Sequence, residues 1–295
     1  MNLGIDLLDS AFLARLEKLD IVARKILSGE FRGDVRTRRR GAGSLFRGHK
    51  SYSQGDDLRF LDWNVYSRLG ELLVKQFDAE ENLNLLLVVD ASGSMDFGGN
   101  NKMIFAQKVA AALSFIALNR HARVDLAILP QDKKKGSAPF FGRNAIGPLF
   151  QRLGSIEAGG DFDLQAELRG MVGKRRGRGV ALVLSDFFAE SGYSKPLQFL
   201  RHQGYRVGAL HVLDREELRP KLHGRTKLVD IESSKSMKRD VSKQMIDAYE
   251  DEVRNWCQGV ETFCAGNDIA YARLDTAWTL ERVVTQALLR GGVLA

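Results

Sequence analysis

Three oxygen-bearing side chains follow the most apolar strand-like run of the chain. The run LLLVV at residues 85–89 leads into Asp90, and Ser92 and Ser94 follow at alternate positions. Side chains two positions apart in an extended segment point the same way, so one carboxylate and two hydroxyls can converge on one point. Oxygen ligands without nearby histidine or cysteine suit a hard cation, here Mg2+, or Mn2+ or Ca2+. The pattern predicts a metal site; the alternative is that these residues only cap a turn before a helix.

A second aspartate follows another strand-like run. The sequence VALVLS at residues 180–185 leads directly into Asp186. From residue 83 onward, apolar strand-like runs alternate with helix-like segments, which is typical of an α/β fold with a mainly parallel sheet and helices on both faces. Ligands of such sheets bind outside the carboxyl ends of the strands. We therefore expect Asp90 and Asp186 to lie on one rim of the sheet.

The expected elements define two parts of the chain. We expect strands over residues 83–89, 123–129, 180–185, 205–213 and 268–276, and helices over residues 102–119, 195–202, 241–265 and 279–289. Upstream, apolar residues at helical spacing predict an opening helix over residues 10–27, followed by short strand-like pieces within residues 41–81. The sequence thus predicts an N-terminal helical and β extension, residues 1–81, packing on an α/β domain, residues 82–295.

Length and composition fit an ordinary globular protein. The 295 residues can bury a full core, in one large domain or two small ones. No uninterrupted apolar run reaches the roughly 18–20 residues of a membrane helix, and the acidic, amphipathic N-terminus is unlike a secretory signal. The two cysteines, Cys257 and Cys264, lie on an expected helix and are not expected to form a disulfide. We expect a cytoplasmic protein without a transmembrane segment.

The net charge of +7 comes from 44 basic and 37 acidic residues. The basic residues gather in short clusters at residues 35–40, 132–136, 173–179 and 235–240. Such clusters can contact nucleic acid, anionic lipid or an acidic protein surface, or can simply be solvated loops. No aromatic residues lie within them to stack on bases, so the sequence does not favour nucleic-acid binding.

The segments around the two aspartates resemble a von Willebrand factor A domain, a Rossmann-like fold with a metal-ion-dependent adhesion site. The resemblance is carried by the run around Asp90, a glycine pair at residues 159–160 and the sequence VLSD ending at Asp186. It implies that Asp90, Ser92 and Ser94 from a first loop and Asp186 from a third loop hold a divalent cation. In that family a threonine from the second loop is a further ligand, and the cation accepts a carboxylate from a partner protein.

The second loop departs from the family pattern. A typical sequence is GGTDL, whereas this chain has GGDFDL at residues 159–164. Alignment on the glycines puts Asp161 in the place of the threonine; alignment on Asp163 and Leu164 puts Phe162 there. Aspartate would bind a metal more tightly and repel an acidic partner, whereas phenylalanine would remove the ligand. Asp161 is our candidate for the fifth ligand.

The upstream segment resembles a narrower family, the bacterial DUF58 proteins. Their signature Y-x-x-G-D-D-x-R-x-x-D-W is present at residues 52–63, and the resemblance extends over nearly the whole chain. It implies a MoxR-type AAA+ ATPase as partner, acting in the assembly or maturation of other proteins. Many relatives carry membrane helices.

Charged residues of this signature have two interpretations. Asp56, Asp57, Arg59 and Asp62 can form a buried ion network that pins the front segment to the sheet, because buried charges beside Trp63 need partners. They can instead form a docking surface for the ATPase.

The leading functional hypothesis is a non-enzymatic interaction module that binds a client carboxylate through its cation. The chain lacks a G-x-x-x-x-G-K-[ST] loop, so the ATPase would supply the mechanical work. The first alternative is a Mg2+-dependent phosphatase-like enzyme with Asp90 as nucleophile, although that class usually has D-x-D and this chain has Ser92 at the second position. The second alternative is a basic nucleic-acid-binding protein.

Overall fold

The chain folds into two compact units. The computed structural model describes residues 7–20, 23, 45–54, 56–78, 84–130, 138–159, 163–172, 179–188, 192–222, 224–229 and 236–289. Met1–Arg32 and Leu83–Ala295 form the first unit, which we call the sheet unit, and Gly33–Asn82 forms the second, which we call the hairpin unit.

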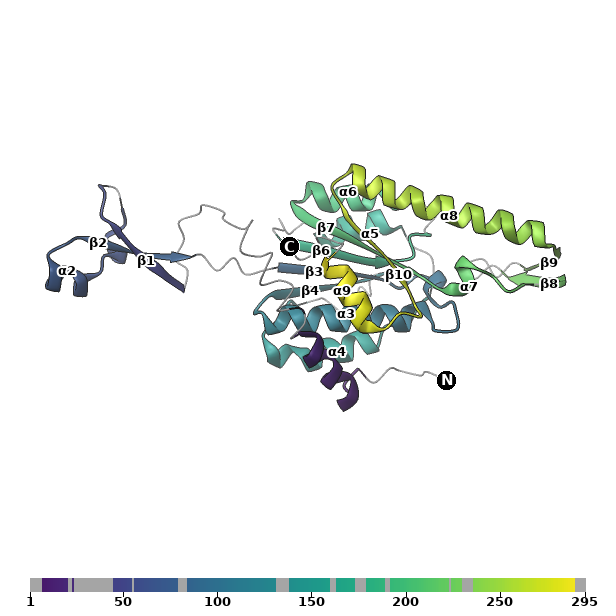
Figure 1. The fold of residues 1–295 in the computed structure, drawn as a ribbon, viewed down its shortest axis with the longest axis horizontal. Coiled ribbons are helices and arrows are strands. Elements are labelled where there is room, and N and C mark those ends of the chain that lie inside the picture. The colour runs from purple at the N-terminus through teal and green to yellow at the C-terminus, as the bar shows by residue number, and fades with distance from the viewer. Residues whose placement is uncertain are drawn as a thin grey trace. The chain divides into compact units, whose positions relative to one another are not determined.

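A six-stranded sheet is the centre of the sheet unit (Figure 1). Its strand order is β10-β7-β6-β3-β4-β5, and all neighbours are parallel except β5, which is antiparallel to β4. The strands are β3 (Asn84–Asp90), β4 (Arg123–Leu129), β5 (Phe140–Phe141), β6 (Gly179–Ser185), β7 (Tyr205–Leu213) and β10 (Ala270–Asp275). This arrangement confirms the predicted α/β fold with a mainly parallel sheet.

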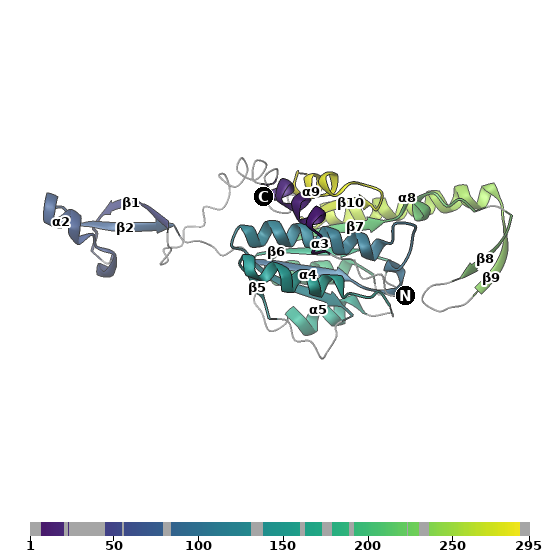
Figure 2. The ribbon, with the colours of Figure 1, turned by 90° about the horizontal axis from the view of Figure 1, so that it is seen from below.

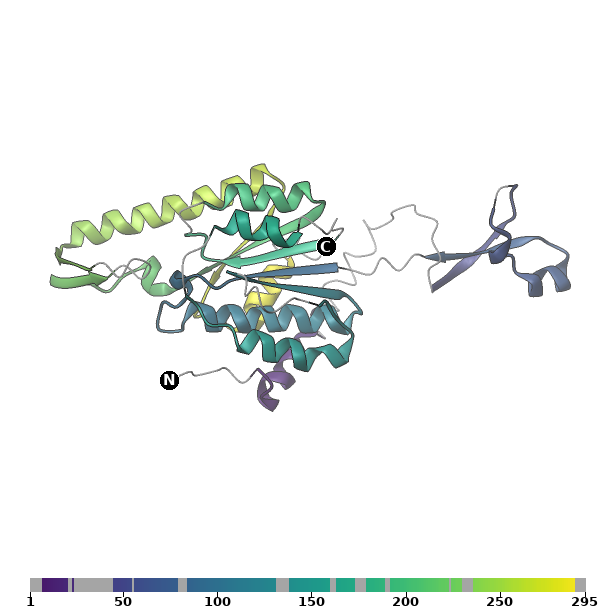
Figure 3. The same ribbon diagram turned by 180° about the vertical axis from the view of Figure 1, so that it is seen from behind.

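Helices cover both faces of the sheet, as predicted. One face carries α3 (Lys102–Asn119), α4 (Ile146–Gly154) and α9 (Leu280–Leu289); the other carries α5 (Leu164–Val172), α6 (Ser194–His202) and α8 (Lys243–Gly266). Figures 1 and 3 show the two layers from front and back, and Figure 2 shows α3 and α4 side by side. Along β3, Leu85 and Leu87 face the first layer and Leu86 and Val88 the second, as expected from the two-residue period of a strand.

Helix α3 is the apolar centre of one layer. Among the described residues it alone is long and apolar enough to cross a membrane, with a mean hydropathy of 1.2 over 18 residues. In the structure 83% of this window is buried, so packing in the core accounts for its apolar composition. The absence of a transmembrane segment remains a prediction.

The opening helix packs on the sheet unit. The structure describes its helical residues 10–20 and 23. Its buried apolar residues, Leu16, Leu19 and Ala23, belong to the same apolar core as α3 and α9. Residues 1–32 therefore group with the sheet unit, whereas the sequence analysis placed residues 1–81 in one segment. The physical reason is that the apolar face of this helix is buried against that core.

Helix α8 only partly follows the sequence prediction. Its buried residues are Val253, Cys257, Val260 and Cys264, and both cysteines are free, as expected. The helical spacing of Met245, Tyr249 and Val253 predicts one face that packs on the sheet, but Met245 and Tyr249 are 46% and 44% exposed. The packing face therefore starts at Val253, about two turns later than the sequence pattern indicated.

The hairpin unit consists of an antiparallel pair of strands and short helical elements. β1 (Leu45–Ser51) pairs with β2 (Leu73–Asp78), and the connection contains a 3-10 helix (Leu58–Phe60) and α2 (Trp63–Leu69). Asp62 caps the start of α2 by accepting hydrogen bonds from two backbone N–H groups. Gly70 ends the helix in the left-handed conformation, at φ 69°.

Short elements were missing from the sequence prediction. They are α2, β5, α4, α5, α7 (Arg215–Leu218) and a second hairpin of β8 (Gly224–Val229) and β9 (Ser236–Val241). Helices α4 and α5 have nine residues each, so they offer few turns over which an apolar period can be recognised.

Candidate functional site

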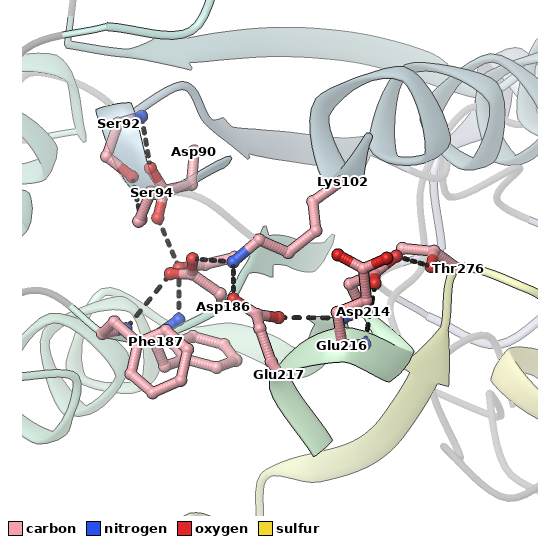
Figure 4. A network of polar contacts seen from close by, with 12 residues as sticks. Asp90, Ser92, Ser94, Lys102, Asp186, Phe187, Asp214, Glu216, Glu217 and Thr276 are labelled. Atoms are coloured by element: carbon pink, nitrogen blue, oxygen red, sulfur yellow. Dashed lines mark hydrogen bonds and ion pairs between the residues drawn. The ribbon is translucent and has the colours of Figure 1, made fainter. Parts of the chain in front are cut away.

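The predicted strand ends meet where the order of the sheet reverses. From β3 the chain continues to β4 on one side, and it later returns to β6 on the other side of β3. This is a topological switch point, the usual ligand position in an open parallel sheet. Asp90 is the last residue of β3 and Asp186 follows β6, and the two strands pair directly. The structure thus brings together Asp90, Ser92, Ser94 and Asp186, which we call the candidate cation site (Figure 4).

Asp90 is held rigidly at the end of its strand. Its carboxyl is buried, Oδ1 accepts the backbone N–H of Ser92 at 2.8 Å, and Oδ2 accepts the hydroxyl of Ser185 at 2.5 Å. Burial raises the pKa of Asp90, and the negative charge of Asp186 raises it further. The two carboxyls are therefore close enough to disfavour a second negative charge.

The two serine hydroxyls converge, as their spacing predicted. Ser92 Oγ and Ser94 Oγ lie 3.0 Å apart. Ser92 precedes a 3-10 helix (Gly93–Met95), but its hydroxyl makes no capping hydrogen bond to that helix. The turn is instead closed by Asp90 through the N–H of Ser92. The capping alternative therefore describes Asp90 and not the serines.

A lysine that the sequence analysis did not single out lies beside this site. Lys102 is 0% exposed, and its Nζ donates to Asp186 Oδ2 at 2.6 Å and to Glu217 Oε1. The rings of Phe97 and Phe188 lie 5.8 and 5.5 Å from the ammonium. Lys102 is the first residue of α3, where the helix dipole disfavours a cation, so the two carboxylates must hold it there.

Glu217 is positioned by the short helix α7. Asp214 and Glu217 form a capping box, in which Glu217 Oε2 accepts the backbone N–H of Asp214 at 2.9 Å. Asp214 in turn accepts the hydroxyl of Thr276 at 2.5 Å and the N–H of Glu216. Burial raises the pKa of Glu217, and the neighbouring Lys102 opposes that rise.

The charges of this cluster fit a divalent cation. The cluster contains four carboxyl groups, those of Asp90, Asp186, Asp214 and Glu217, and one ammonium group, that of Lys102, so its acidic groups outnumber its basic ones. Uncompensated buried charge is costly, and oxygen donors suit a hard cation. Within the described ranges, no group of three or more His, Cys, Asp or Glu residues could hold a metal. The serine hydroxyls would therefore have to complete the shell.

The second loop starts beside the first. The backbone N–H of Gly159 donates to the carbonyl of Ala91 at 2.9 Å. Asp163 is exposed and caps the start of α5 by accepting the N–H of Ala166 at 3.2 Å. Asp161 and Phe162, the two candidates for the threonine position, lie outside the described residues.

An aromatic layer supports the Asp186 loop from the α8 side. Phe188 stacks on Trp256 with ring centroids 4.3 Å apart and planes at 13°. His211 is fully buried beside Trp256, and its Nδ1 lies 2.8 Å from the hydroxyl of Tyr271. Burial lowers the pKa of His211 to about 3, so this histidine is neutral near pH 7.

Four residues of the charged cluster escaped the sequence analysis: Lys102, Ser185, Asp214 and Glu217. The sequence does contain signals for some of these residues. A lysine at the first position of an otherwise apolar helix implies a compensating negative charge. The sequence DREE at residues 214–217 is a capping-box pattern. Nothing local, however, indicates that Glu217 reaches a residue 115 positions away.

The signature residues of the hairpin unit do not form one buried network. Asp57 and Arg59 form an exposed pair at 2.7 Å, with the arginine side chain 83% exposed. Of the four charged signature residues, Asp62 is the buried residue, and its carboxylate lies 2.8 Å from His49 and 3.4 Å from Lys75. The expectation of one buried network is therefore wrong for Asp57 and Arg59. Asp57 and Asp62 cap short helices, and Asp56 pairs with Lys50 at 3.0 Å.

Sequence comparison identifies a family of unknown function. The structure is similar to BatB from Bacteroides thetaiotaomicron (TM-score 0.42, 14% identity, 71% of this chain and 98% of that one) and to an aerotolerance-related membrane protein from Bacteroides fragilis (TM-score 0.38, 13% identity, 70% and 98%). The uncharacterized proteins Rv1480 of Mycobacterium tuberculosis and Mb1516 of Mycobacterium bovis are each 27% identical over 98% of this chain and 93% of their own length. Residues 48–257 match the family described as "Protein of unknown function DUF58", and the chain belongs to this family.

Proposed function

We propose that the chain is a non-enzymatic protein-interaction module that depends on a divalent cation. In this proposal the sheet unit is a von Willebrand factor A-like domain, and the candidate cation site is its adhesion site. The observation that carries the proposal is the convergence of Asp90, Ser92, Ser94 and Asp186 at the switch point of the sheet, in a cluster whose carboxyl groups outnumber its one ammonium group.

The residues of the site have distinct tasks in this proposal. Asp90, fixed by hydrogen bonds to both of its oxygens, supplies a rigid anionic ligand. Ser92 and Ser94 supply neutral oxygen ligands, which leave positive charge on the cation. A bound Mg2+ or Mn2+ offers an open coordination position that a carboxylate of a client protein can fill.

We further propose a MoxR-type AAA+ ATPase as the partner that supplies mechanical work in the cytoplasm. The hairpin unit is the candidate docking element, because it carries large apolar side chains in water beside charged ones. Trp63 and Leu69 of α2 are 63% and 69% exposed, and Arg59 lies close by in the sequence. Exposed apolar groups of this kind are common at protein interfaces.

The partner proposal is tested by mixing the purified chain with a MoxR-type ATPase from the same genome and a non-hydrolysable ATP analogue. We expect a complex in size-exclusion chromatography that is lost in the variant W63S/L69S and retained in D90A. A failure to form any complex with the folded wild-type chain would contradict the partnership.

The phosphatase alternative makes a different prediction. Both oxygens of Asp90 already accept hydrogen bonds, and the residue two positions on is a serine rather than an acid. We expect no Asp90-dependent hydrolysis of p-nitrophenyl phosphate in Mg2+. Robust turnover that disappears in D90A would replace the interaction module by an enzyme.

A further inference from the structure

Lys102 holds one of the carboxylates that the candidate cation site needs. Its Nζ lies 2.6 Å from Asp186 Oδ2, and the two side chains are 0% and 1% exposed. The other oxygen of Asp186 accepts the backbone N–H of Phe188 at 3.2 Å. A cation bound by Asp186 therefore has to share this carboxylate with an ammonium group (Figure 4).

The lysine has a second anchor on a different element. Glu217 of α7 accepts a hydrogen bond from Nζ, and it is itself held by the N–H of Asp214 at 2.9 Å. Lys102 also has the aromatic faces of Phe97 and Phe188 within reach of its ammonium. The ammonium can thus give up Asp186 and still keep one carboxylate in a fixed position.

Electrostatics makes the two cations compete. Two positive charges on one carboxylate repel each other, and the repulsion is strong in a buried site because water does not screen it. A monovalent ion brings no more charge than the ammonium that it would displace. A divalent ion brings twice as much, so it has the stronger attraction to the paired carboxyls of Asp90 and Asp186.

We propose that Lys102 is a built-in competitor that sets the affinity and charge selectivity of the candidate cation site. Its ammonium releases Asp186 to a divalent cation and stays hydrogen-bonded to Glu217. Monovalent ions, and divalent ions at low concentration, do not displace the ammonium from Asp186. This inference rests on the proposed cation site, and it adds a residue that the adhesion-site pattern does not contain.

Two substitutions change the competition in opposite directions. K102M removes the competitor, so we expect Mn2+ to bind about tenfold more tightly or better. E217Q removes the second anchor and leaves the ammonium on Asp186, so we expect weaker binding. E217Q also removes a negative charge, and this loss weakens cation binding by itself. The double variant K102M/E217Q separates the effect of the lost charge from the effect of the lost anchor. If Lys102 competes, E217Q costs less affinity in the K102M background than in the wild-type chain.

The variants also need to fold. K102M leaves Asp186 and Glu217 without their ammonium, and an unpaired buried charge lowers stability. K102M/E217Q removes one of these two charges and is the variant to use if K102M is unstable. Thermal unfolding with and without Mg2+ supplies an independent readout, because we expect Mg2+ to raise the Tm of K102M/E217Q more than that of E217Q.

The deciding experiment is calorimetric titration of Mn2+ into the wild-type chain, K102M, E217Q and K102M/E217Q. The control for each protein is the same protein with D90A added. Tightest binding in the variants without the lysine, and weakest binding in E217Q, all lost with D90A, is the expected result. Equal or weaker Asp90-dependent binding without the lysine would overturn the competitor role and leave the cation site standing. No Asp90-dependent binding in any protein would overturn both.

Discussion

At the scale of single residues, Ser185 links the two strand ends of the candidate cation site. Its hydroxyl donates to Asp90 Oδ2 at 2.5 Å and accepts the N–H of Phe187 at 2.8 Å. S185A should lower the free energy of unfolding by about 1–3 kcal/mol, because it leaves a buried acceptor and a buried donor unpaired. Urea denaturation followed by circular dichroism measures the loss.

Ser114 supplies the matched control for this substitution. It is as buried as Ser185, but its hydroxyl makes no hydrogen bond within the described part of the chain. S114A should therefore be neutral or slightly stabilising. Equal losses in S185A and S114A would show that the link to Asp90 contributes nothing.

Gly98 makes room for the carboxylate that caps α7. It has φ 91°, and a Cβ at this position would lie 2.4 Å from Asp214 Cγ. Gly192 of the same unit has φ 75° with nothing within 4 Å of such a Cβ. Both alanine variants incur the strain of a positive φ, about 1–2 kcal/mol, but only G98A displaces Asp214 from Thr276. We expect a lower urea midpoint for G98A than for G192A, and similar midpoints would contradict the close packing at Asp214.

At the scale of elements, α2 depends on its cap rather than on the exposed ion pair before it. A hydrogen bond with His49 lowers the pKa of Asp62 to about 2, and the N–H groups of Val65 and Asn64 help. Because the folded pKa is depressed, the stabilisation is fully present above the ordinary value of 3.8 and is lost as the pH falls from there toward about 2. D62N removes this stabilisation at pH 7.

Hydrogen exchange measures the effect on this element. Amides of Trp63–Leu69 should exchange faster in D62N than in the wild-type chain, since the capping charge is lost. The variant D57N/R59Q changes an exposed pair and should leave exchange in α2 unchanged. Faster exchange in D57N/R59Q together with unchanged exchange in D62N would restore the interpretation of Asp57 and Arg59 as structural residues.

The strands and long helices could be predicted because each is a continuous pattern. β4 and α3 begin and end at the predicted residues, and β3 and β6 do so within one residue. Asp90 and Asp186 could be placed on one rim because parallel strands share a carboxyl edge. The contacts of Lys102 with Glu217 could not be predicted, since they depend on the order of the strands and on a four-residue helix.

For the whole molecule, the proposed function places two separate tasks in the two units of one chain. The candidate cation site lies within the sheet unit, whereas Trp63 and Leu69 belong to the hairpin unit. D90A should abolish cation binding and leave ATPase binding intact, and W63S/L69S should do the opposite, because the two sets of residues belong to separate compact units. Calorimetry and size-exclusion chromatography measure the two activities in the same preparations. Loss of both activities in either folded variant would contradict the separation.

The most direct test of the central claim is calorimetric titration of Mg2+ and Mn2+ into metal-stripped wild-type protein beside D90A. We predict saturable binding of one cation per chain to the wild-type protein and none to the folded variant. Binding of equal strength to both proteins, or no binding to the wild-type protein, would contradict a cation site at the ends of β3 and β6.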